Sequence, residues 1–438
     1  MLLATIAKDK VEDLSKQDVF YSIYPRNTAY REMKVYHQLN RLGNLLWKFF
    51  AVRELESNPL EQELYTIKYA NRIGQDRLFR QRAKAMINEL NQEGVLDTEQ
   101  SLIAYQLNQL VAYRTQEDVF NRAYHLQAMN NHLDAFYFER KLLFGYQYLV
   151  NITQRSAAYE ATFIDELLIL VEEHEEHFKR LKGVEFYYRG VKTLTEQDNT
   201  EHYEFLKSLL EQYEELPRGV AMNIYGFCTN YCIRGISKGV PEYSRELFTI
   251  YQLGIEGELV YSNGWISEWD YRNILTLGCA LGEYEWTETF LESHYERLNE
   301  SVRDNAYHYC KALYLYTRLR YEESTNYLLQ VSFTNSRYHL QGMLLRLRIS
   351  YDQNEYTLFL NDAETLRLYV LRSPNMSASD KRAYSNFIRF AKKLVLIQES
   401  RPYARADTTR KQLELLKEKI EQNDNVINRA WLLQACAF

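Results

Sequence analysis

The stretch that decides the fold is the turn Leu319-Arg320-Tyr321-Glu322-Glu323-Ser324, which lies between two segments of helical periodicity. Side chains at steps of three or four residues share one face of an α-helix. Small or apolar residues stand at such steps on both sides of the turn: Ala312 and Leu315 before it, and Ser324, Leu328 and Val331 within and after it. The stretch therefore predicts two short amphipathic helices joined by a tight turn.

Two further segments carry a related turn. They read Gly282-Glu283-Tyr284-Glu285-Trp286-Thr287 and Asn354-Glu355-Tyr356-Thr357-Leu358. The tyrosines of the three turns are 37 and then 35 residues apart. A near-constant period of this length indicates one supersecondary unit that recurs along the chain.

The pattern resembles the tetratricopeptide repeat (TPR), which has a small residue in its first helix, an acidic-aromatic turn and a small residue early in its second helix. The likeness is best over residues 271–356, and Tyr203 and Tyr243 are candidates for earlier copies. The copies depart from the family pattern because Leu275 and Leu347 occupy the small position and the closing proline is missing. In segments such as 13–20 and 428–433, the chain is also similar to uncharacterised helical-repeat proteins of Bacteroidota, a likeness that implies no activity.

Helical patterning also dominates outside the repeats. The 438 residues include 16 glycines and 6 prolines, about half the usual share, which excludes a sandwich or barrel with many tight hairpins. Helix starts are predicted at Asn58-Pro59, at Asp97 with Gln100 three residues later, and at Ser377. No alternating pattern predicts a strand of any length.

The expected fold is therefore all-α: an α-solenoid of stacked antiparallel helical hairpins that forms a TPR-like right-handed superhelix. We expect residues 1–100 to form an N-terminal helical cap whose first helix begins close to Met1. Residues 101–400 are expected to carry the repeats, and residues 401–438 a C-terminal capping helix. A cap is needed because an end repeat would otherwise expose its apolar face.

Composition and charge exclude several classes of function. The net charge of −6 gives no reason to expect a dedicated polyanion-binding protein. The sequence shows no signal-peptide pattern and no stretch near the ~18 apolar residues of a membrane helix, so we expect a soluble protein without a membrane partner. The odd number of sparse cysteines, five in all, argues against a disulfide framework and favours the cytoplasm.

Motifs for catalysis or cofactor binding are missing from the sequence. It contains no glycine-rich phosphate loop and no G-x-S-x-G elbow. His174 and His177 are three residues apart, whereas a zinc protease helix needs a spacing of four. Cys228 and Cys232 have no second ligand pair nearby, and we interpret them as buried apolar side chains. We expect no catalytic residue, no cofactor and no metal ligand.

The leading hypothesis is a non-catalytic scaffold or adaptor that binds a peptide or protein partner in the groove lined by the first helices of the hairpins. Arginine and asparagine there would hold the backbone or carboxylates of an extended peptide, while tyrosine rings would pack against its side chains. The partner-binding candidates, copy by copy, are Arg272, Asn273 and Thr276, then Tyr309, Leu313 and Tyr316, then Arg348 and Tyr351.

Two alternatives remain open. A basic stripe over Arg72–Lys84 has the charge of a nucleic-acid contact and suggests a nucleic-acid-associated regulatory module. Acidic runs elsewhere balance it, and no recognised nucleic-acid-binding motif accompanies it, so a solvated helix face is the competing interpretation. An unrecognised all-α enzyme is the third hypothesis, and it would need a deep pocket with converging ionisable groups.

Overall fold

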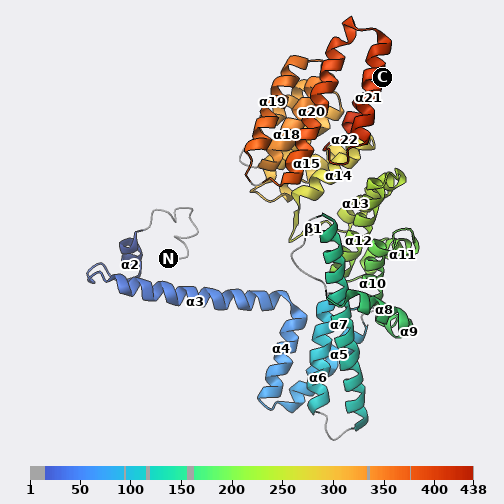
Figure 1. Cartoon of the computed structure of the whole chain (residues 1–438). Helices are drawn as coiled ribbons and strands as arrows, with labels where there is room; N and C mark the ends of the chain where they lie inside the picture. The colour runs from blue at the N-terminus through green and yellow to red at the C-terminus, as the bar shows by residue number, and fades with distance from the viewer. Residues whose placement is uncertain are drawn as a thin grey trace. The chain divides into compact units, whose positions relative to one another are not determined.

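The computed structural model describes residues 15–92, 95–114, 119–154, 162–332, 336–374 and 376–437. These residues are almost entirely helical, so the prediction of an all-α protein is confirmed (Figure 1). The helix expected close to Met1 falls on residues 1–14, which lie outside the described residues. No helix in the described ranges is long and apolar enough to cross a membrane.

The chain divides into two compact units. Unit 1 comprises residues 1–208 and 215–220, and unit 2 comprises residues 209–214 and 221–438. The expected division at residues 100 and 400 stays a prediction. The helices up to residue 210 are α2 (Lys16–Ile23), α3 (Glu32–Ser57), α4 (Pro59–Arg72), α5 (Asp76–Gln92), α6 (Thr98–Arg114), α7 (Val119–Gln154), α8 (Ile164–Glu173), α9 (Glu175–Phe178), α10 (Lys182–Thr195) and α11 (Glu201–Leu210).

The remaining elements belong almost wholly to unit 2. They are the 3-10 helix η2 (Tyr213–Glu215), α12 (Arg218–Ser237), α13 (Glu242–Glu256), β1 (Tyr261–Ser262), β2 (Trp265–Ile266), α14 (Glu268–Ala280), α15 (Tyr284–Ser293), η3 (Tyr295–Arg297), α16 (Arg303–Thr317), α17 (Tyr321–Leu328), α18 (Ser336–Asp352), α19 (Tyr356–Arg372), α20 (Ala378–Ser400), η4 (Arg401–Tyr403), α21 (Ala406–Glu421) and α22 (Arg429–Ala435).

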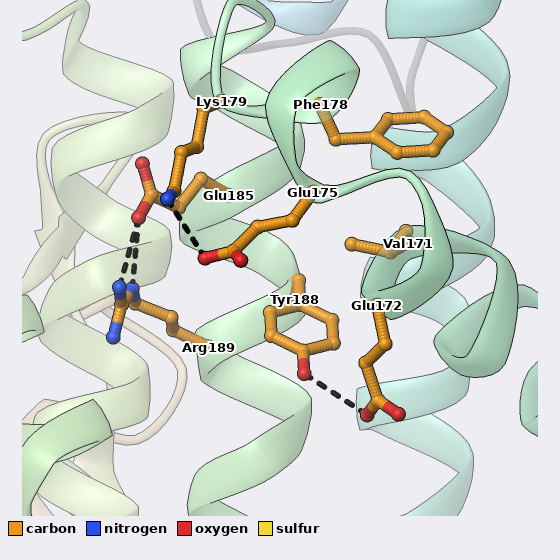
Figure 2. A pocket seen from close by; sticks show the side chains of 8 residues that line it. All are labelled: Val171, Glu172, Glu175, Phe178, Lys179, Glu185, Tyr188 and Arg189. Carbon is orange, nitrogen blue, oxygen red and sulfur yellow. Dashed lines mark hydrogen bonds and ion pairs between the residues drawn. The ribbon is translucent and has the colours of Figure 1, made fainter.

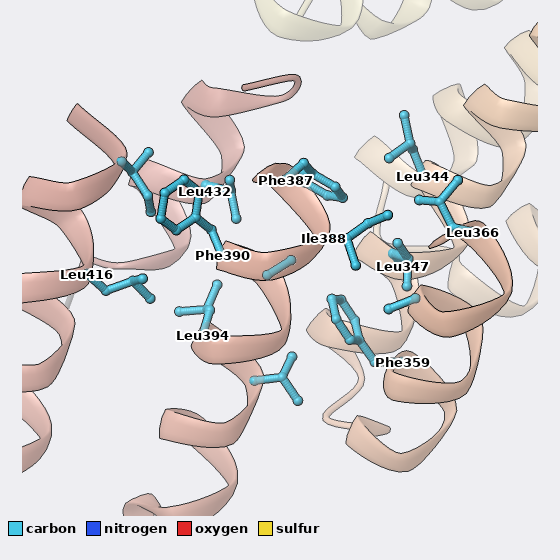
Figure 3. Close-up of a cluster of buried hydrophobic side chains, with 14 of the residues drawn as sticks. Leu344, Leu347, Phe359, Leu366, Phe387, Ile388, Phe390, Leu394, Leu416 and Leu432 are labelled. Atoms are coloured by element: carbon cyan, nitrogen blue, oxygen red, sulfur yellow. The ribbon is translucent and has the colours of Figure 1, made fainter. Parts of the chain in front are cut away.

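Each unit contains a hydrophobic core of its own. In unit 1, the apolar faces of α4, α5 and α6 meet around Ile67, Met86 and Leu107. In unit 2, helices α18 to α22 enclose a larger cluster that includes Phe359 and Phe387, both fully buried (Figure 3). Burial of these apolar side chains is the main term that stabilises helices of this length.

The three sequence-related turns share one backbone geometry. Gly282, Leu319 and Asn354 adopt φ angles of 78°, 59° and 59°. In each turn, the N–H of the following residue donates to the carbonyl five positions earlier: Glu283 to Gly278 at 3.0 Å, Arg320 to Leu315 at 2.9 Å and Glu355 to Ser350 at 2.8 Å. This is the Schellman ending of a helix, and the next helix begins one residue later, at the tyrosine of each turn.

Close helix crossings follow these turns where the residues are small. The hydroxyl of Ser324, on α17, donates to the carbonyl of Ala312, on α16, at 2.7 Å, and both residues are fully buried. In the preceding pair, α14 and α15, a Cβ atom on Gly278 would come within 2.2 Å of the Thr287 hydroxyl. Small side chains thus permit the short interhelical distance in both pairs.

The predicted helix starts are confirmed. Asn58 caps α4 by accepting a hydrogen bond from the Glu61 N–H, with Pro59 as the first helical residue. Asp97 and Gln100 form a reciprocal capping box at α6, with hydrogen bonds of 2.7 and 2.8 Å. Ser377 caps α20 in the same manner as Asn58.

One pair of very short strands occurs within the all-α fold, at a place where no alternating pattern predicts it. Strands β1 and β2 form a two-residue antiparallel hairpin around Asn263 and Gly264. These two residues have φ angles of 51° and 81°, as a type I′ turn requires. Asparagine and glycine adopt positive φ at little cost, so this dipeptide favours the hairpin even between such short strands.

All five cysteines are buried, and none of them forms a disulfide among the described residues. Cys228 and Cys232 lie on α12 with no measurable solvent exposure, so their interpretation as buried core side chains is confirmed. Burial raises the pKa of Cys279 and of Cys436 to about 11. Thiols with a pKa this high are protonated and unreactive at neutral pH.

Candidate functional site

The predicted partner-binding residues lie on helices α14, α16 and α18 of unit 2. Helix α16 packs against both α14 and α18, so the first helices of the three sequence copies are neighbours. Five of the eight candidate residues are half-buried, two are buried and one is exposed. The contacts of each side chain decide which of them could meet a partner.

Arg272, on α14, is half-buried. Its guanidinium stacks 4.7 Å from the centre of the Trp269 ring and donates to the side-chain oxygen of Asn273 at 3.3 Å. The exposed Thr276 hydroxyl donates to the carbonyl of Arg272 at 2.7 Å, a bond within the helix. Asn273 and Thr276 therefore support α14, whereas the positive charge of Arg272 has no carboxylate within ion-pairing distance among the described residues.

Tyr309 and Leu313, on α16, are buried, with 6% and 8% of their surfaces exposed. The Tyr309 ring packs against Tyr338 of α18, with 5.9 Å between ring centres. Burial raises the pKa of Tyr309 to about 12, and the nearby positive charges of Arg348 and Arg272 partly oppose that rise. Both arginines, from different hairpins, thus act electrostatically on one phenol.

Arg348, on α18, is also half-buried. Its Nε–H is shielded from solvent and has no hydrogen-bond acceptor. Its guanidinium lies 6.0 Å from the centre of the Trp431 ring, and no ion pair with a carboxylate forms among the residues that the structure describes. Burial and the nearby carboxylate of Asp352, one turn beyond Arg348, raise the pKa of Tyr316.

Tyr351 is held by the C-terminal part of unit 2. Its hydroxyl donates to the Ala435 carbonyl at 3.2 Å and accepts from the Gln398 amide at 3.3 Å. Its ring packs edge-on against Trp431 at 5.3 Å. Tyr351 is thus committed to internal contacts that fix α22 on α18.

The structure therefore separates the eight candidates into two groups. Arg272, Tyr309 and Arg348 come together, and we name these three residues the arginine face. Asn273, Thr276, Leu313, Tyr316 and Tyr351 make contacts within unit 2 that the fold itself uses.

Two residues that the sequence analysis did not single out also lie at this face. Tyr338 is 4% exposed, and burial and the negative charge of the nearby Glu268, on α14, raise the pKa of its hydroxyl. Oε2 of Glu268 is buried without a hydrogen-bond donor. Glu268 stands four residues before Arg272, and this i, i+4 spacing on one helix face is a signal that could have identified it.

The pocket in Figure 2 is a second candidate site, in unit 1. It lies between α8, α9 and α10 and has a volume of about 240 Å³. Its charges are paired within its own wall: Lys179 with Glu175 at 2.9 Å, Arg189 with Glu185 at 2.9 Å, and Tyr188 donating to Glu172 at 3.0 Å. Burial and that hydrogen bond raise the pKa of Tyr188 to about 12. A wall neutralised in this way offers no free charge to a ligand.

The basic stripe over Arg72–Lys84 spans the end of α4 and the first half of α5. Arg80 and Lys84 line a polar cleft of about 970 Å³ between α5, α6 and α7. Elsewhere along the stripe, Arg82 pairs with Glu63 at 3.3 Å, and Asp76 pairs with Arg114. The use of this stripe by a nucleic acid stays a prediction.

The histidine pair His174 and His177 does not form a metal site. His174 ends α8 and precedes α9, so a break in the helix separates it from His177. The closest carboxylate oxygen to His177 is that of Asp134, at 3.9 Å. Within the described ranges, no three potential ligands from His, Cys, Asp or Glu are grouped as a metal ion would need.

A scan against protein-family models finds no match, and neither a curated protein nor a solved structure is significantly similar to this chain.

Proposed function

We propose that this protein is a non-catalytic interaction module whose second unit is a TPR-like array of stacked hairpins and binds an acidic peptide segment at the arginine face. The observation that carries the proposal is that Arg272 and Arg348 are half-buried and yet have no carboxylate partner among the described residues. Charged groups removed from water are normally paired, because an unpaired charge loses hydration without compensation.

Several other half-buried cations of the same unit are paired with a carboxylate. Lys311 pairs with Glu292 at 2.6 Å, Arg303 with Glu296 at 2.9 Å and Lys392 with Glu364 at 2.7 Å. Arg272 and Arg348 are instead stacked on tryptophan rings, which orient the guanidinium planes without neutralising them. Two oriented cations that flank one buried tyrosine are suited to carboxylates on a partner.

The arrangement of helices supports an array. Helix α16 contacts α14, α17 and α18, as the first helix of a stacked hairpin does. The three turns with a common backbone geometry recur at the spacing of the sequence repeat. An extended peptide crossing α14, α16 and α18 would meet Arg272 first and Arg348 last.

The proposal is tested with peptides selected from a random dodecapeptide display library on the full chain. We expect Asp- and Glu-rich sequences to be enriched and to bind in fluorescence polarisation. Each charge-assisted hydrogen bond is worth roughly 1.5–3 kcal/mol, so the double variant Arg272→Ala/Arg348→Ala should weaken binding by about a hundredfold.

The matched control is Arg372→Ala/Arg382→Ala, which removes the same charge from exposed positions on α19 and α20. It should bind the selected peptides within about twofold of the wild type. Equal binding by the double variant at the arginine face, or enrichment without acidic residues, would refute the proposal.

A further inference from the structure

Helix α3 exposes many large apolar side chains to solvent. Its main contacts are with α2 and α4, and Val35 is the buried residue along its length. Seven large apolar residues along it are between 37% and 72% exposed: Leu39, Leu45, Leu46, Trp47, Phe49, Phe50 and Val52. Contiguous exposed apolar surface of this kind marks a binding site.

The side chains of α3 are sorted around the helix axis. Lys34, Arg41 and Lys48 are seven residues apart and form one basic stripe, because seven residues complete almost two turns. Leu39, Leu46 and Phe50 fall on the opposite side. Leu42, Trp47 and Phe49 lie beside these residues and widen the apolar face to almost half of the circumference, whereas Leu45 and Val52 lie beside the basic stripe.

The charge of this segment has one sign. No aspartate or glutamate occurs from Met33 to Arg53, while the same stretch carries Lys34, Arg41, Lys48 and Arg53. Arg53 pairs with Glu56 just beyond it, at 3.1 Å. Arg41 and Lys48 are exposed and make no ion pair with any residue that the structure describes. The complementary surface is therefore apolar in depth and anionic at its boundary.

We propose that α3 lies in the interface of an anionic phospholipid membrane, with its apolar face among the acyl chains and its basic stripe toward the headgroups. A lysine- and arginine-rich polar face opposite tryptophan, phenylalanine and leucine is the composition of interfacial helices. The wide apolar face fits a lipid surface better than the narrow seam of a coiled coil. The sequence-based exclusion of a membrane partner considered only helices that span.

A second copy of α3 fits these observations less well. It would cover part of the apolar face, but it would add the same positive charges without a single acidic residue in the segment to oppose them. Self-association is therefore an outcome that the test must separate from lipid binding.

The test is cosedimentation of the full chain with vesicles. One vesicle preparation is phosphatidylcholine alone, and the other adds about 30% phosphatidylserine to reproduce an anionic leaflet. We expect sedimentation with the anionic vesicles only, and its loss at high salt because the attraction is screened. The variant Arg41→Glu/Lys48→Glu should reduce partitioning roughly a hundredfold or more.

A matched control reverses the same number of charges elsewhere in unit 1. Arg180→Glu/Lys182→Glu changes two exposed cations at the junction of α9 and α10 and should leave sedimentation unchanged. Loss of binding in both variants would show that net charge, not α3, recruits the vesicle, and would overturn the proposal.

Fluorescence of Trp47 gives an independent readout. The difference spectrum between the wild type and Trp47→Phe should shift to the blue on addition of anionic vesicles, because the exposed indole enters an apolar medium. No sedimentation with either vesicle, or a dimer in light scattering that Phe49→Glu/Phe50→Glu dissociates, would refute membrane binding in favour of a protein contact.

Discussion

At the scale of single residues, Glu139 is a buried acidic side chain of unit 1. It lies on α7 and is 3% exposed, and its Oε2 has no hydrogen-bond donor. It fits there because Gly183, on α10, has no side chain; a Cβ atom would stand 2.0 Å from Oε1. Burial raises the pKa of Glu139 to about 7, although a hydrogen bond from Thr98 opposes the rise.

Glu139 should therefore make stability depend on pH. Its pKa is higher in the folded chain than the ordinary 4.5, so the folded state binds the proton more tightly. Stability from this group is complete below pH 4.5 and falls as the pH rises to about 7. We expect Glu139→Gln to stabilise the protein at pH 8 by about 1–3 kcal/mol and to have little effect at pH 4.5.

Urea denaturation at the two pH values measures this difference. Glu166→Gln, at an exposed position on α8, is the matched control and should not alter the pH profile. A destabilised Glu139→Gln variant at pH 8 would show that the ionised carboxylate is needed.

Whether the role of a single residue could be predicted depends on how far apart in the sequence its contacts lie. The caps at Asn58, Asp97 and Ser377 could be predicted because each joins a side chain to a backbone group three residues away. The raised pKa of Glu139 could not be predicted, because its burial arises only when α6, α7 and α10 meet. The lack of an ion pair at Arg348, although the carboxylate of Asp352 interacts with its charge, likewise depends on what neighbouring helices present.

At the scale of elements, the turns carry the most specific geometry. Leu319 adopts a left-handed backbone with a φ of 59°, which is unfavourable for a residue with a Cβ atom. Its side chain is 71% exposed, so little burial offsets this cost. The equivalent position in the preceding copy is Gly282, which adopts this conformation freely.

Leu319→Gly should therefore stabilise the protein. The left-handed conformation costs an L-residue roughly 1–2 kcal/mol, and greater freedom of glycine in the unfolded chain cancels part of the gain. We expect a net increase of about 0.5–1 kcal/mol in the free energy of unfolding, measured by urea titration. Leu329→Gly is the control: Leu329 is similarly exposed, at 68%, but has a right-handed backbone, so its replacement should destabilise.

Elements could be predicted where the pattern is local and periodic. The turn tyrosines mark the starts of α15, α17 and α19 because a Schellman ending fixes where the next helix begins. The hairpin at Asn263-Gly264 was missed because strands of two residues have no alternation to detect, although the dipeptide itself is a hairpin signal. The 36-residue length of α7 was also not anticipated, since no glycine or proline marks either of its ends.

At the scale of the whole molecule, two separate cores imply two separable responses to mutation. Leu107 and Phe359 are both fully buried, the first in the core of unit 1 and the second in that of unit 2. Truncation of such side chains to alanine costs about 2–5 kcal/mol. We expect Leu107→Ala to raise hydrogen exchange mainly in α4–α6 and Phe359→Ala mainly in α18–α20.

Hydrogen exchange followed by mass spectrometry distinguishes the two patterns by peptide. Ala51→Gly, on the exposed α3, serves as a control that should leave exchange in both cores unchanged. A rise in both units with either variant would mean that the chain unfolds as one cooperative body.

The helical class of the molecule could be predicted because scarcity of glycine and proline and a 3.6-residue period are properties of the sequence itself. The division near residues 208–220 could not, because no linker composition marks it and contacts alone define it. The three residues of the arginine face were named from the repeat register, but the tryptophans that orient Arg272 and Arg348 come from outside that register.

Because every cysteine is buried, we expect the native chain not to react with maleimide reagents. Cys279 and Cys436, with pKa values near 11, hold almost no thiolate at neutral pH. A single cysteine introduced at an exposed position such as Lys48 or Arg372 could then carry a spin label or fluorophore without removal of the native thiols. Two such cysteines in one chain would give probe-to-probe distances while all five native thiols are kept.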